Sequence, residues 1–352
     1  MNKPLVAIVL ALVVIGAGAW YFWGASASPK TPTILERATS ENRPVRVAII
    51  NYLRILEGPN NGLKQGMKAL GYEEGKNIAY TSYYGDGNFE KMVADAKDVI
   101  QNNKADIIVG NPGEGGQAAL QAAQELGSNI PVLYMLSFDP LAMKLINSYQ
   151  SSGNQVTGVA VDLGYLTGKR LEFLHQIAPN AKKLGIITGV KALDITATKG
   201  RDEVMKQAPK FGFEVVEYTV DVLPGPTSDQ AVIDVTKKIK AGEIDAFYRM
   251  LGPVTSTPGT IAAYAAMGER LKIPTEFFGH EQGSLLNYDN DYDDAGVQLA
   301  TLVDKVLKGA TPTSIPSENA RKYILEIDLR VANKIGIKVP DSLLSIATKV
   351  TR

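Results

Sequence analysis

Residues Ala105–Pro140 read ADIIVGNPGEGGQAALQAAQELGSNIPVLYMLSFDP, and this stretch decides the fold. A short apolar run ends in a Gly/Pro turn at 110–113, and a helical Ala/Gln-rich run follows directly. A second short apolar run then ends at Asp139-Pro140. Two buried strands joined by a helix form a β-α-β unit, which implies a parallel sheet.

In parallel sheets, ligands bind outside the carboxyl ends of the strands. Both predicted strand ends carry groups that a ligand uses. Free backbone amides stand at the helix start after Gly110, and a carboxylate stands at Asp139. The unit therefore predicts one half of a binding cleft.

Length and composition narrow the class of protein. A chain of 352 residues is too long for one ordinary core, so two lobes are expected. Lys+Arg and Asp+Glu balance at 37 each, which argues against nucleic acid as a partner. Cysteine is absent, and the only histidines are His175 and His280, so no metal site and no cofactor are predicted.

The N-terminus departs from this globular pattern. The run Pro4–Trp23 is uncharged and ends in four aromatic residues, and roughly 20 apolar residues span a bilayer as a helix. Ala25-Ser26-Ala27 also fits a signal-peptidase cleavage pattern. Residues 1–27 are therefore predicted to be a signal anchor or a signal peptide, and residues 28–43 a linker. Either alternative places the remaining chain outside the inner membrane, in the periplasm or at the membrane's outer face.

The rest of the chain alternates strands and helices. Strands are predicted at 45–50, 77–84, 184–188, 213–220, 245–251, 274–279 and 322–327. Helices are predicted at 62–70, 89–101, 166–176, 197–207, 229–241, 258–271, 292–308 and 329–334, with a shorter one after Pro140. The second half repeats the pattern of the first, which favours an α/β protein with two similar lobes.

Several pieces of the chain, in this order, match one family. They include GYEEGKN at 71–77, DIIVGNP at 106–112, DP at 139–140, GNQVTGV at 153–159, KVLKGA at 305–310 and ANKIGI at 332–337. Across about residues 44 to 352 the chain resembles the ABC-transporter substrate-binding proteins of the tryptophan/tyrosine-binding type. None of the pieces is specific alone, but together and in register they form a strong signal.

This resemblance implies a type I periplasmic-binding-protein architecture with two Rossmann-like lobes and three interlobe crossovers. The crossings are placed near Thr157, Leu285 and Thr313. Lobe one then holds 44–157 and 286–312, and lobe two holds 158–285 and 313–352. Proteins of this type bind small solutes, aromatic amino acids among them, and deliver them to the permease subunits of an ABC transporter.

Candidate ligand-binding residues of lobe one lie where strands give way to helices. Asn51 and Tyr52 follow the first strand, and Asn111 and Gly113 form the turn before the Ala/Gln-rich helix. A helix start favours an anion such as a carboxylate. Glu114 in the first turn departs from the small residues that such proteins carry there. Its charge competes with a bound anion, and so favours a cationic or polyhydroxyl solute.

Asp139 is the predicted acceptor for a ligand amine, because it ends a strand and the following proline keeps it extended. The alternative role for Asp139 is a helix cap over Pro140.

In lobe two the candidates at strand ends are Thr188, Tyr248, Arg249, His280 and Glu281. His280-Glu281 lacks a nucleophile or a second acid beside it, so no catalytic residue is assigned. The acidic run 289–294 lacks the Gly and Glu of a calcium loop, and it is interpreted as the start of a helix.

The prediction is thus an extracytoplasmic solute-binding protein that closes around an amino-acid-like or other polar or aromatic solute. A membrane-anchored ligand sensor is the alternative. An enzyme such as a nucleotide-sugar transferase is a third reading. It needs a phosphate loop or an acid pair across the cleft, and the sequence shows neither.

Overall fold

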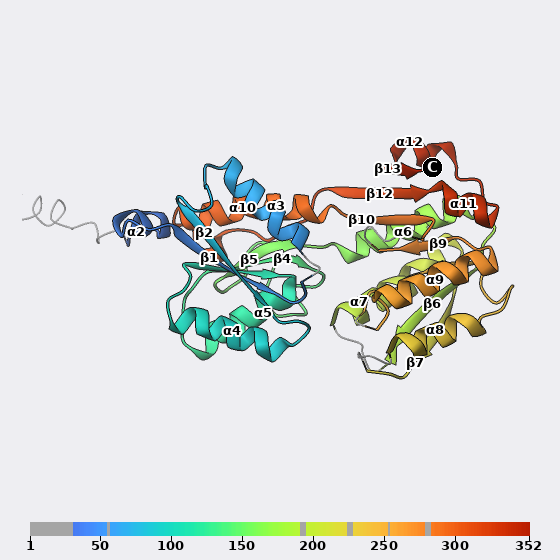
Figure 1. The fold of residues 1–352 in the computed structure, drawn as a ribbon, viewed down its shortest axis with the longest axis horizontal. Coiled ribbons are helices and arrows are strands. Elements are labelled where there is room, and N and C mark those ends of the chain that lie inside the picture. Colours follow the sequence, from blue (N-terminus) through green and yellow to red (C-terminus); the bar gives the residue numbers. More distant parts are fainter. Residues whose placement is uncertain (1–30, 55–56, 191–194, 224–227, 253, 279–282) are drawn as a thin grey trace, which may run out of the picture.

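The computed structural model describes residues 31–54, 57–190, 195–223, 228–252, 254–278 and 283–352, which fold into two α/β lobes (Figure 1). The first sheet has the strand order β11-β5-β4-β3-β1-β2, and all its pairs are parallel. Its strands are β1 (Val45–Asn51), β2 (Ile78–Tyr84), β3 (Ile107–Asn111), β4 (Val132–Ser137), β5 (Val156–Ala160) and β11 (Glu318–Asn319). The parallel β-α-β unit predicted at 105–140 is therefore confirmed.

The second sheet has the strand order β13-β12-β10-β9-β8-β6-β7, with one antiparallel pair, β10 with β12. Its strands are β6 (Lys183–Gly189), β7 (Glu214–Val220), β8 (Ala246–Tyr248), β9 (Thr275–Phe277), β10 (Leu286–Asn290), β12 (Tyr323–Asp328) and β13 (Lys349–Thr351). We call the first sheet and its helices lobe one, and the second sheet and its helices lobe two.

Three crossings join the lobes. The chain leaves the first sheet after Ala160, returns between Asn290 and Tyr292, and leaves again between Asn319 and Tyr323. The two-lobe α/β fold with three crossovers is confirmed. The strands nevertheless place the crossings later than predicted at Thr157, Leu285 and Thr313. β10 (LNYDN) and β11 (EN) are short and polar, which hides their strand character in the sequence.

Helices cover both faces of each sheet. Those of lobe one are α2 (Ile34–Ser40), α3 (Glu57–Ala69), α4 (Phe89–Gln101), α5 (Gly113–Glu125) and α10 (Tyr292–Leu307). Those of lobe two are α6 (Leu163–Ile177), α7 (Ile195–Gln207), α8 (Ser228–Lys238), α9 (Pro258–Leu271), α11 (Leu329–Ile335) and α12 (Asp341–Ile346). The described part of the chain also contains short 3₁₀ turns at Ala208–Phe211 and Pro312–Ser314.

Strand β1 shows why both faces are covered. Val47 and Ile49 pack with α3 and α10, whereas Ala48 and Ile50 point to the other face and pack with α4 and α5. Alternate residues of a strand point to opposite faces, so an unbroken apolar run requires helices on both sides. This requirement sets the three-layer form of the lobe.

Glycines let α3 and α10 cross at close range. A Cβ atom on Gly62 would lie 1.9 Å from the Asp293 carbonyl oxygen, and one on Gly296 would lie 2.0 Å from that of Pro59. Gly58, Gly62 and Gly66 repeat every four residues, so they share one face of α3. The predicted helix began only at 62, because glycine and proline usually interrupt helices; here they serve this crossing.

Further differences from the predicted elements concern short segments. The segment after Pro140 is a turn rather than a helix. Within the acidic run 289–294, Asp291 caps α10 and Asp293 and Asp294 lie in its first turn, as predicted, whereas Asp289 belongs to β10. α12 and β13 were not predicted.

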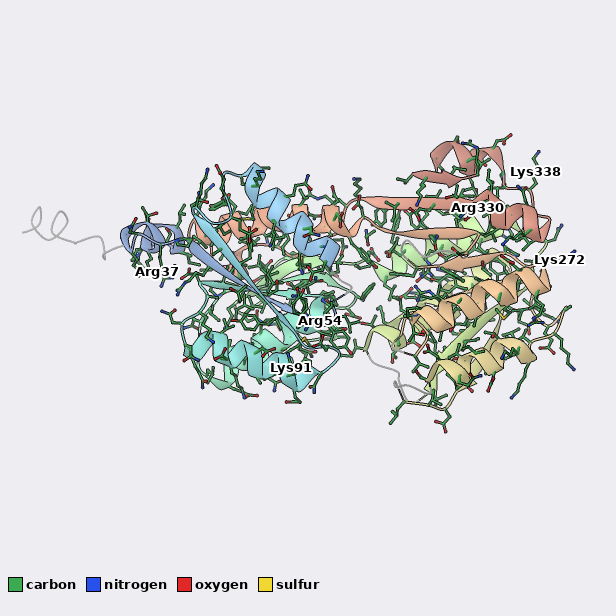
Figure 2. The ribbon with its side chains drawn as sticks, in the orientation of Figure 1. Arg37, Arg54, Lys91, Lys272, Arg330 and Lys338 are labelled. Atoms are coloured by element: carbon green, nitrogen blue, oxygen red, sulfur yellow. The ribbon has the colours of Figure 1, made fainter. Side chains whose placement is uncertain are left out.

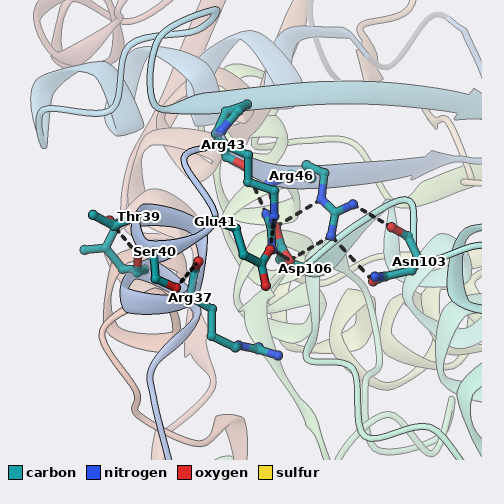
Figure 3. Close-up of polar contacts among 10 residues, drawn as sticks. Arg37, Thr39, Ser40, Glu41, Arg43, Arg46, Asn103 and Asp106 are labelled. Carbon is teal, nitrogen blue, oxygen red and sulfur yellow. Dashed lines mark hydrogen bonds and ion pairs between the residues drawn. The ribbon is translucent and has the colours of Figure 1, made fainter.

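Residues 34–40 form the helix α2 within the stretch predicted to be a linker, so that part of the prediction is wrong. The Thr33 and Glu36 side chains form a capping box, and Ile34 and Ala38 are buried. Beside α2, Arg43 and Arg46 both bind Asp106 at the start of β3, with contacts of 2.6 and 3.1 Å (Figure 3). Burial opposes the charge on Asp106, but these hydrogen bonds outweigh it and lower its pKa. The network fixes the segment between α2 and β1, and the buried Ile34 and Ala38 pack α2 against lobe one.

The two lobes lie side by side along the long axis of the molecule (Figure 2). Arg37 of α2 is near one end, and Lys272 and Lys338 of lobe two are near the other. Arg54, which follows β1, lies at the end of lobe one that is turned toward lobe two. We call this end the interlobe face of lobe one, and the corresponding end of the second sheet the interlobe face of lobe two.

Candidate functional site

Three asparagines form a buried amide network at the interlobe face of lobe one. Asn51 ends β1, Asn111 ends β3, and Asn60 reaches both from α3. Asn60 Nδ2 donates to Asn51 Oδ1 at 2.8 Å, and Asn111 Nδ2 donates to Asn60 Oδ1 at 3.0 Å. Asn51 and Asn111 have no exposed surface. The network is neutral and fixes the ends of two central strands.

Next to this network, Tyr52 and Arg54 lie on the loop that follows β1. Tyr52 is half-buried, and its backbone N–H donates to the Asn111 carbonyl at 2.8 Å. Arg54 is exposed, lies 4.4 Å from the ring centroid of Tyr84, and pairs with Asp86 at 3.0 Å. Arg54 therefore acts as a surface arginine in this conformation.

The start of α5 packs tightly on the sheet. A Cβ atom on Gly115 would lie 2.2 Å from the Ile50 carbonyl oxygen, and one on Gly113 would lie 2.7 Å from Ser137 Oγ. Glu114 is half-buried in the first turn of α5, where a carboxylate interacts favourably with the helix dipole. The first turn thus already contains a negative charge.

Asp139 follows a distortion in β4. The register shifts between Met135 and Ser137, and Leu136 has a φ of 55°, which is uncommon for a side chain of this size. Asp139 Oδ1 accepts from the Ala142 N–H at 3.0 Å, and Oδ2 lies 3.6 Å from Lys199 Nζ of α7. Asp139 therefore caps a turn with one oxygen and faces lobe two with the other.

Thr188 ends β6 of lobe two and is tied to its neighbours. Its hydroxyl donates to Glu217 Oε1 at 2.7 Å, and Arg201 binds both oxygens of Glu217 at 2.7 and 2.6 Å. Arg201 is the main cause of the lowered pKa of Glu217. The charges of this group are paired within lobe two.

A buried ion pair lies at the interlobe face of lobe two. Arg170 of α6 binds Glu276 of β9 through Nε at 2.7 Å and Nη2 at 2.6 Å, and both side chains are 1% exposed or less. Burial works against the charge on Arg170, but the attraction of Glu276 outweighs it and raises the pKa of Arg170. Burial also raises the pKa of Glu276 to about 7, with Arg170 opposing the shift.

Aromatic rings enclose this ion pair. The Arg170 guanidinium lies 4.1 Å from the ring centroid of Tyr248 and 4.6 Å from that of Phe278. Arg249 is 2% exposed and donates to Ser256 Oγ at 2.8 Å and to the Phe278 carbonyl at 3.1 Å. Tyr248 and Arg249 thus help to build the buried interior of lobe two.

Asp289 joins this cluster at the crossing from β10 to α10. Its Oδ1 accepts from the Asn290 N–H at 2.7 Å, and the Tyr292 hydroxyl also hydrogen-bonds to it. Burial raises the pKa of Asp289 to about 7, while the hydrogen bonds and the charges of Arg170 and Arg249 oppose the shift. Asn290 Nδ2 donates to the Ala320 and Lys322 carbonyls, so it links two of the crossings.

Among the described residues, two side-chain contacts join the interlobe faces. Lys199 of lobe two approaches Asp139 of lobe one, and the ring centroids of Phe138 and Phe278 lie 5.9 Å apart. Phe138 follows β4, and Phe278 follows β9. The carboxyl ends of the two sheets therefore face each other, which is the arrangement used for ligand binding in open α/β sheets.

The profile of the ABC transporter substrate binding protein family matches residues 48–351. This chain belongs to that family. A solute-binding role and an extracytoplasmic location follow from the membership, and the predicted family resemblance is confirmed.

Similar proteins agree with this assignment. The chain is 24% identical over 263 residues to the tyrosine-binding protein of Clostridioides difficile (strain R20291), covering 74% of this chain and 71% of the relative. It superposes with a TM-score of 0.74 on a conserved domain protein from Vibrio cholerae, at 25% identity over 88% of this chain and 100% of the other. It superposes equally well, at 0.74, on an ABC domain in complex with L-Trp from Streptococcus pneumoniae, at 21% identity over 87% and 99%.

Six of the ligand-binding residues predicted for this substrate-binding protein end or follow β1, β3 or β4 at the interlobe face of lobe one, namely Asn51, Tyr52, Asn111, Gly113, Glu114 and Asp139. Thr188, Tyr248 and Arg249 lie at the corresponding ends of β6 and β8, where their side chains are buried. His280 and Glu281 lie outside the described residues.

Sequence reasoning missed Asn60, Arg170, Lys199, Glu276 and Asp289. Lys199 and Arg170 occupy helical positions with no local signature, so only the tertiary structure shows their partners. Glu276 and Asp289 were detectable in principle, since charged residues inside short strands need buried partners.

Two further observations concern metals and membranes. Within the described ranges, no group of three or more His, Asp or Glu side chains is arranged to hold a metal ion. None of the helices of the described chain combines the length and apolar character that a membrane span needs. The predicted leader, residues 1–27, lies outside the described ranges.

Proposed function

We propose that this protein captures an amino-acid-like or other small polar or aromatic solute between its two interlobe faces and delivers it to an ABC permease. The observation that carries the proposal is the opposition of Asp139 and Phe138 on lobe one to Lys199 and Phe278 on lobe two. Charged and aromatic side chains thus converge from the carboxyl ends of two sheets, where small solutes are bound in such folds.

Hinge closure is the proposed mode of capture. Short segments at Val161, Asp291 and Lys322 join the lobes. Two of these segments are linked to each other, because Lys322 Nζ forms an ion pair with Asp291 Oδ2 at 2.9 Å. A few residues between rigid elements can absorb the rotation that brings two lobes together around a ligand. The relatives named above, which are similar to this chain and bind tyrosine or L-Trp, support an amino acid as the first candidate.

Binding without chemical turnover is part of the proposal. A phosphate-transfer site needs backbone amides that remain available to an anion, and Glu114 occupies the first turn of α5. We further propose that residues 1–27 direct the chain out of the cytoplasm, as a cleaved signal or as an anchor. With α2 docked on lobe one, the free tether is then shorter than residues 28–43.

A thermal-shift screen of amino acids, polyamines, nucleosides and sugars tests the proposal. One class should stabilise the protein saturably, by about 2.7 kcal/mol when its concentration is 100 times the dissociation constant. Mass spectrometry of the recovered solute should show it unchanged. The proposal is contradicted if none of the solutes stabilises the protein, or if the bound solute is chemically converted.

A further inference from the structure

We propose that Lys199 of lobe two recognises the carboxylate of the bound solute, while Asp139 of lobe one holds its ammonium group. The solute is then a zwitterion, of which a free α-amino acid is the simplest kind. This inference rests on the proposed capture of a solute between the lobes. Its new element is the lysine, which gives lobe two a specific chemical role.

The geometry assigns the two poles. Asp139 Oδ1 already accepts from the Ala142 N–H, so Oδ2 is the oxygen turned toward Lys199. The Nζ–Oδ2 distance of 3.6 Å is longer than a good charge-assisted hydrogen bond. The Lys199 side chain is 42% exposed and the Asp139 side chain 18%, so both remain accessible to a solute.

Exchange of partners makes a zwitterion favourable. Ion pairs with this exposure contribute little to stability, so separating Lys199 from Asp139 costs little. A zwitterion inserted between them replaces one ion pair by two, with its ammonium on Asp139 and its carboxylate on Lys199. The lysine side chain is long and flexible and carries three N–H donors, so it can stay paired with a negatively charged group throughout the entry of the solute.

A solute with only one charge should bind less tightly than a zwitterion. An amine without a carboxylate would satisfy Asp139 but leave Lys199 enclosed without an anion when the lobes close. A carboxylate without an amine would leave Asp139 in the same position. Enclosing an unpaired charge is strongly unfavourable, so the pair selects for solutes that carry both charges.

Two arginines of lobe two are less suited than Lys199 to bind the solute carboxylate, because they are already paired. Arg201 is bound to Glu217, and Arg170 is buried against Glu276. Recruiting either arginine to a solute carboxylate would break a well-formed pair within lobe two. The contact between Phe138 and Phe278 lies next to Asp139 in sequence and offers apolar surface for a solute side chain.

Matched ligands and variants test the inference by isothermal titration calorimetry. The ligands are L-tyrosine and L-tryptophan, their decarboxylated forms tyramine and tryptamine, and their deaminated forms 3-(4-hydroxyphenyl)propionate and indole-3-propionate. The variants are Lys199→Met and Asp139→Asn. The controls are Lys206→Met, on the same helix α7 with a partner on its own helix, and the exposed Asp202→Asn.

An amino acid should bind the parent protein at least tenfold more tightly than its two singly charged analogues. Lys199→Met should weaken binding of the amino acid at least tenfold and strengthen binding of the amine, because it removes the cation that the amine leaves unpaired. Asp139→Asn should weaken binding of the amino acid at least tenfold and strengthen binding of the propionate, because it removes the anion that the propionate leaves unpaired. Both controls should bind as the parent does.

Four results overturn the inference. If the Lys199→Met variant binds the amino acid as tightly as the parent protein does, Lys199 has no role in recognising the solute. Equal weakening of amino acid and amine by Lys199→Met shows a general effect on lobe closure. If sugars, nucleosides or polyamines bind and amino acids do not, the zwitterion is excluded while the proposed capture function stands. If no member of the wider panel binds, both fail.

Discussion

The interlobe faces of the two lobes are built from opposite kinds of polar group. Lobe one presents the neutral amide network of Asn51, Asn60 and Asn111, whereas lobe two encloses the charges of Arg170, Arg249, Glu276 and Asp289. Both sets are buried at the carboxyl ends of parallel strands. An amide that loses a partner leaves one unsatisfied hydrogen bond, but an ion that loses its partner leaves an uncompensated charge. Lobe two therefore depends more strongly on each of its buried polar residues.

The largest expected effect is that of Glu276→Gln. The variant leaves the Arg170 guanidinium buried without a counter-charge, so the free energy of unfolding should fall by about 3–5 kcal/mol in urea denaturation. Glu269→Gln, which removes an exposed pair with Lys334, should change it by less than about 1 kcal/mol. Similar values for the two variants would remove the distinction between the buried cluster and a surface ion pair.

Asn60→Ala should have a smaller effect in lobe one. It removes the hydrogen bonds of Asn60 to Asn51 Oδ1 and Asn111 Nδ2, but these two groups remain bonded to each other at 3.3 Å, so the total loss should be about 1–3 kcal/mol. The exposed Asn102→Ala is the control and should stay within about 0.5 kcal/mol of the parent. A loss as large as that of Glu276→Gln would show that the neutral network is as critical as the charged cluster.

The charged cluster should also respond to pH. The pKa of Asp289 is raised to about 7, whereas an unfolded Asp titrates near 3.8, so between these values the native state holds the extra proton. The contribution of Asp289 to stability should therefore be greatest below about pH 4 and fall as the pH rises to about 7.

Asp289→Asn removes this titration, and its free energy of unfolding should vary less steeply with pH over this window than that of the parent. The groups that face Asp289 are Arg170, Arg249, Glu276 and the Tyr292 hydroxyl. Urea denaturation of both proteins at several pH values measures the difference. An identical slope in both would show that Asp289 is already ionised in the native state at low pH.

The smallest stability effect is expected at the contact between the lobes. Asp139→Asn keeps an oxygen that can accept from the Ala142 N–H and loses only a partly exposed ion pair, so stability should change by less than about 1 kcal/mol. Thermal unfolding without solute measures it. A loss above about 2 kcal/mol would make Asp139 a structural residue of lobe one.

The sequence predicts most of the scaffold because its central strands are unbroken apolar runs. Ile107–Asn111 and Val132–Ser137 are strands as expected, and Phe89–Gln101 is a helix with the predicted ends. Prediction fails where function or packing overrides local preference. The glycines of α3 belong to a helix because α10 crosses there, and β10 contains an aspartate because a buried cluster receives it.

The candidate site likewise contains residues that the sequence predicts and residues that only the tertiary structure shows. Residues at strand ends are predictable because strand direction alone brings Asn51, Asn111 and Asp139 to one edge. The partners of these residues come from helices, and no periodicity in α6 or α7 shows that Arg170 meets Glu276 or that Lys199 meets Asp139. Their roles depend on how one element lies against another.

The most direct test of the account is the distance between the lobes with and without solute. The chain contains no cysteine, so Glu90→Cys on α4 and Asp202→Cys on α7 place one exposed spin label on each lobe. With an amino acid that stabilises the protein in the thermal screen, the account predicts that the label-to-label distance measured by electron paramagnetic resonance shortens and its distribution narrows. Stabilisation by the same solute with an unchanged distance distribution would contradict closure of the two lobes around it.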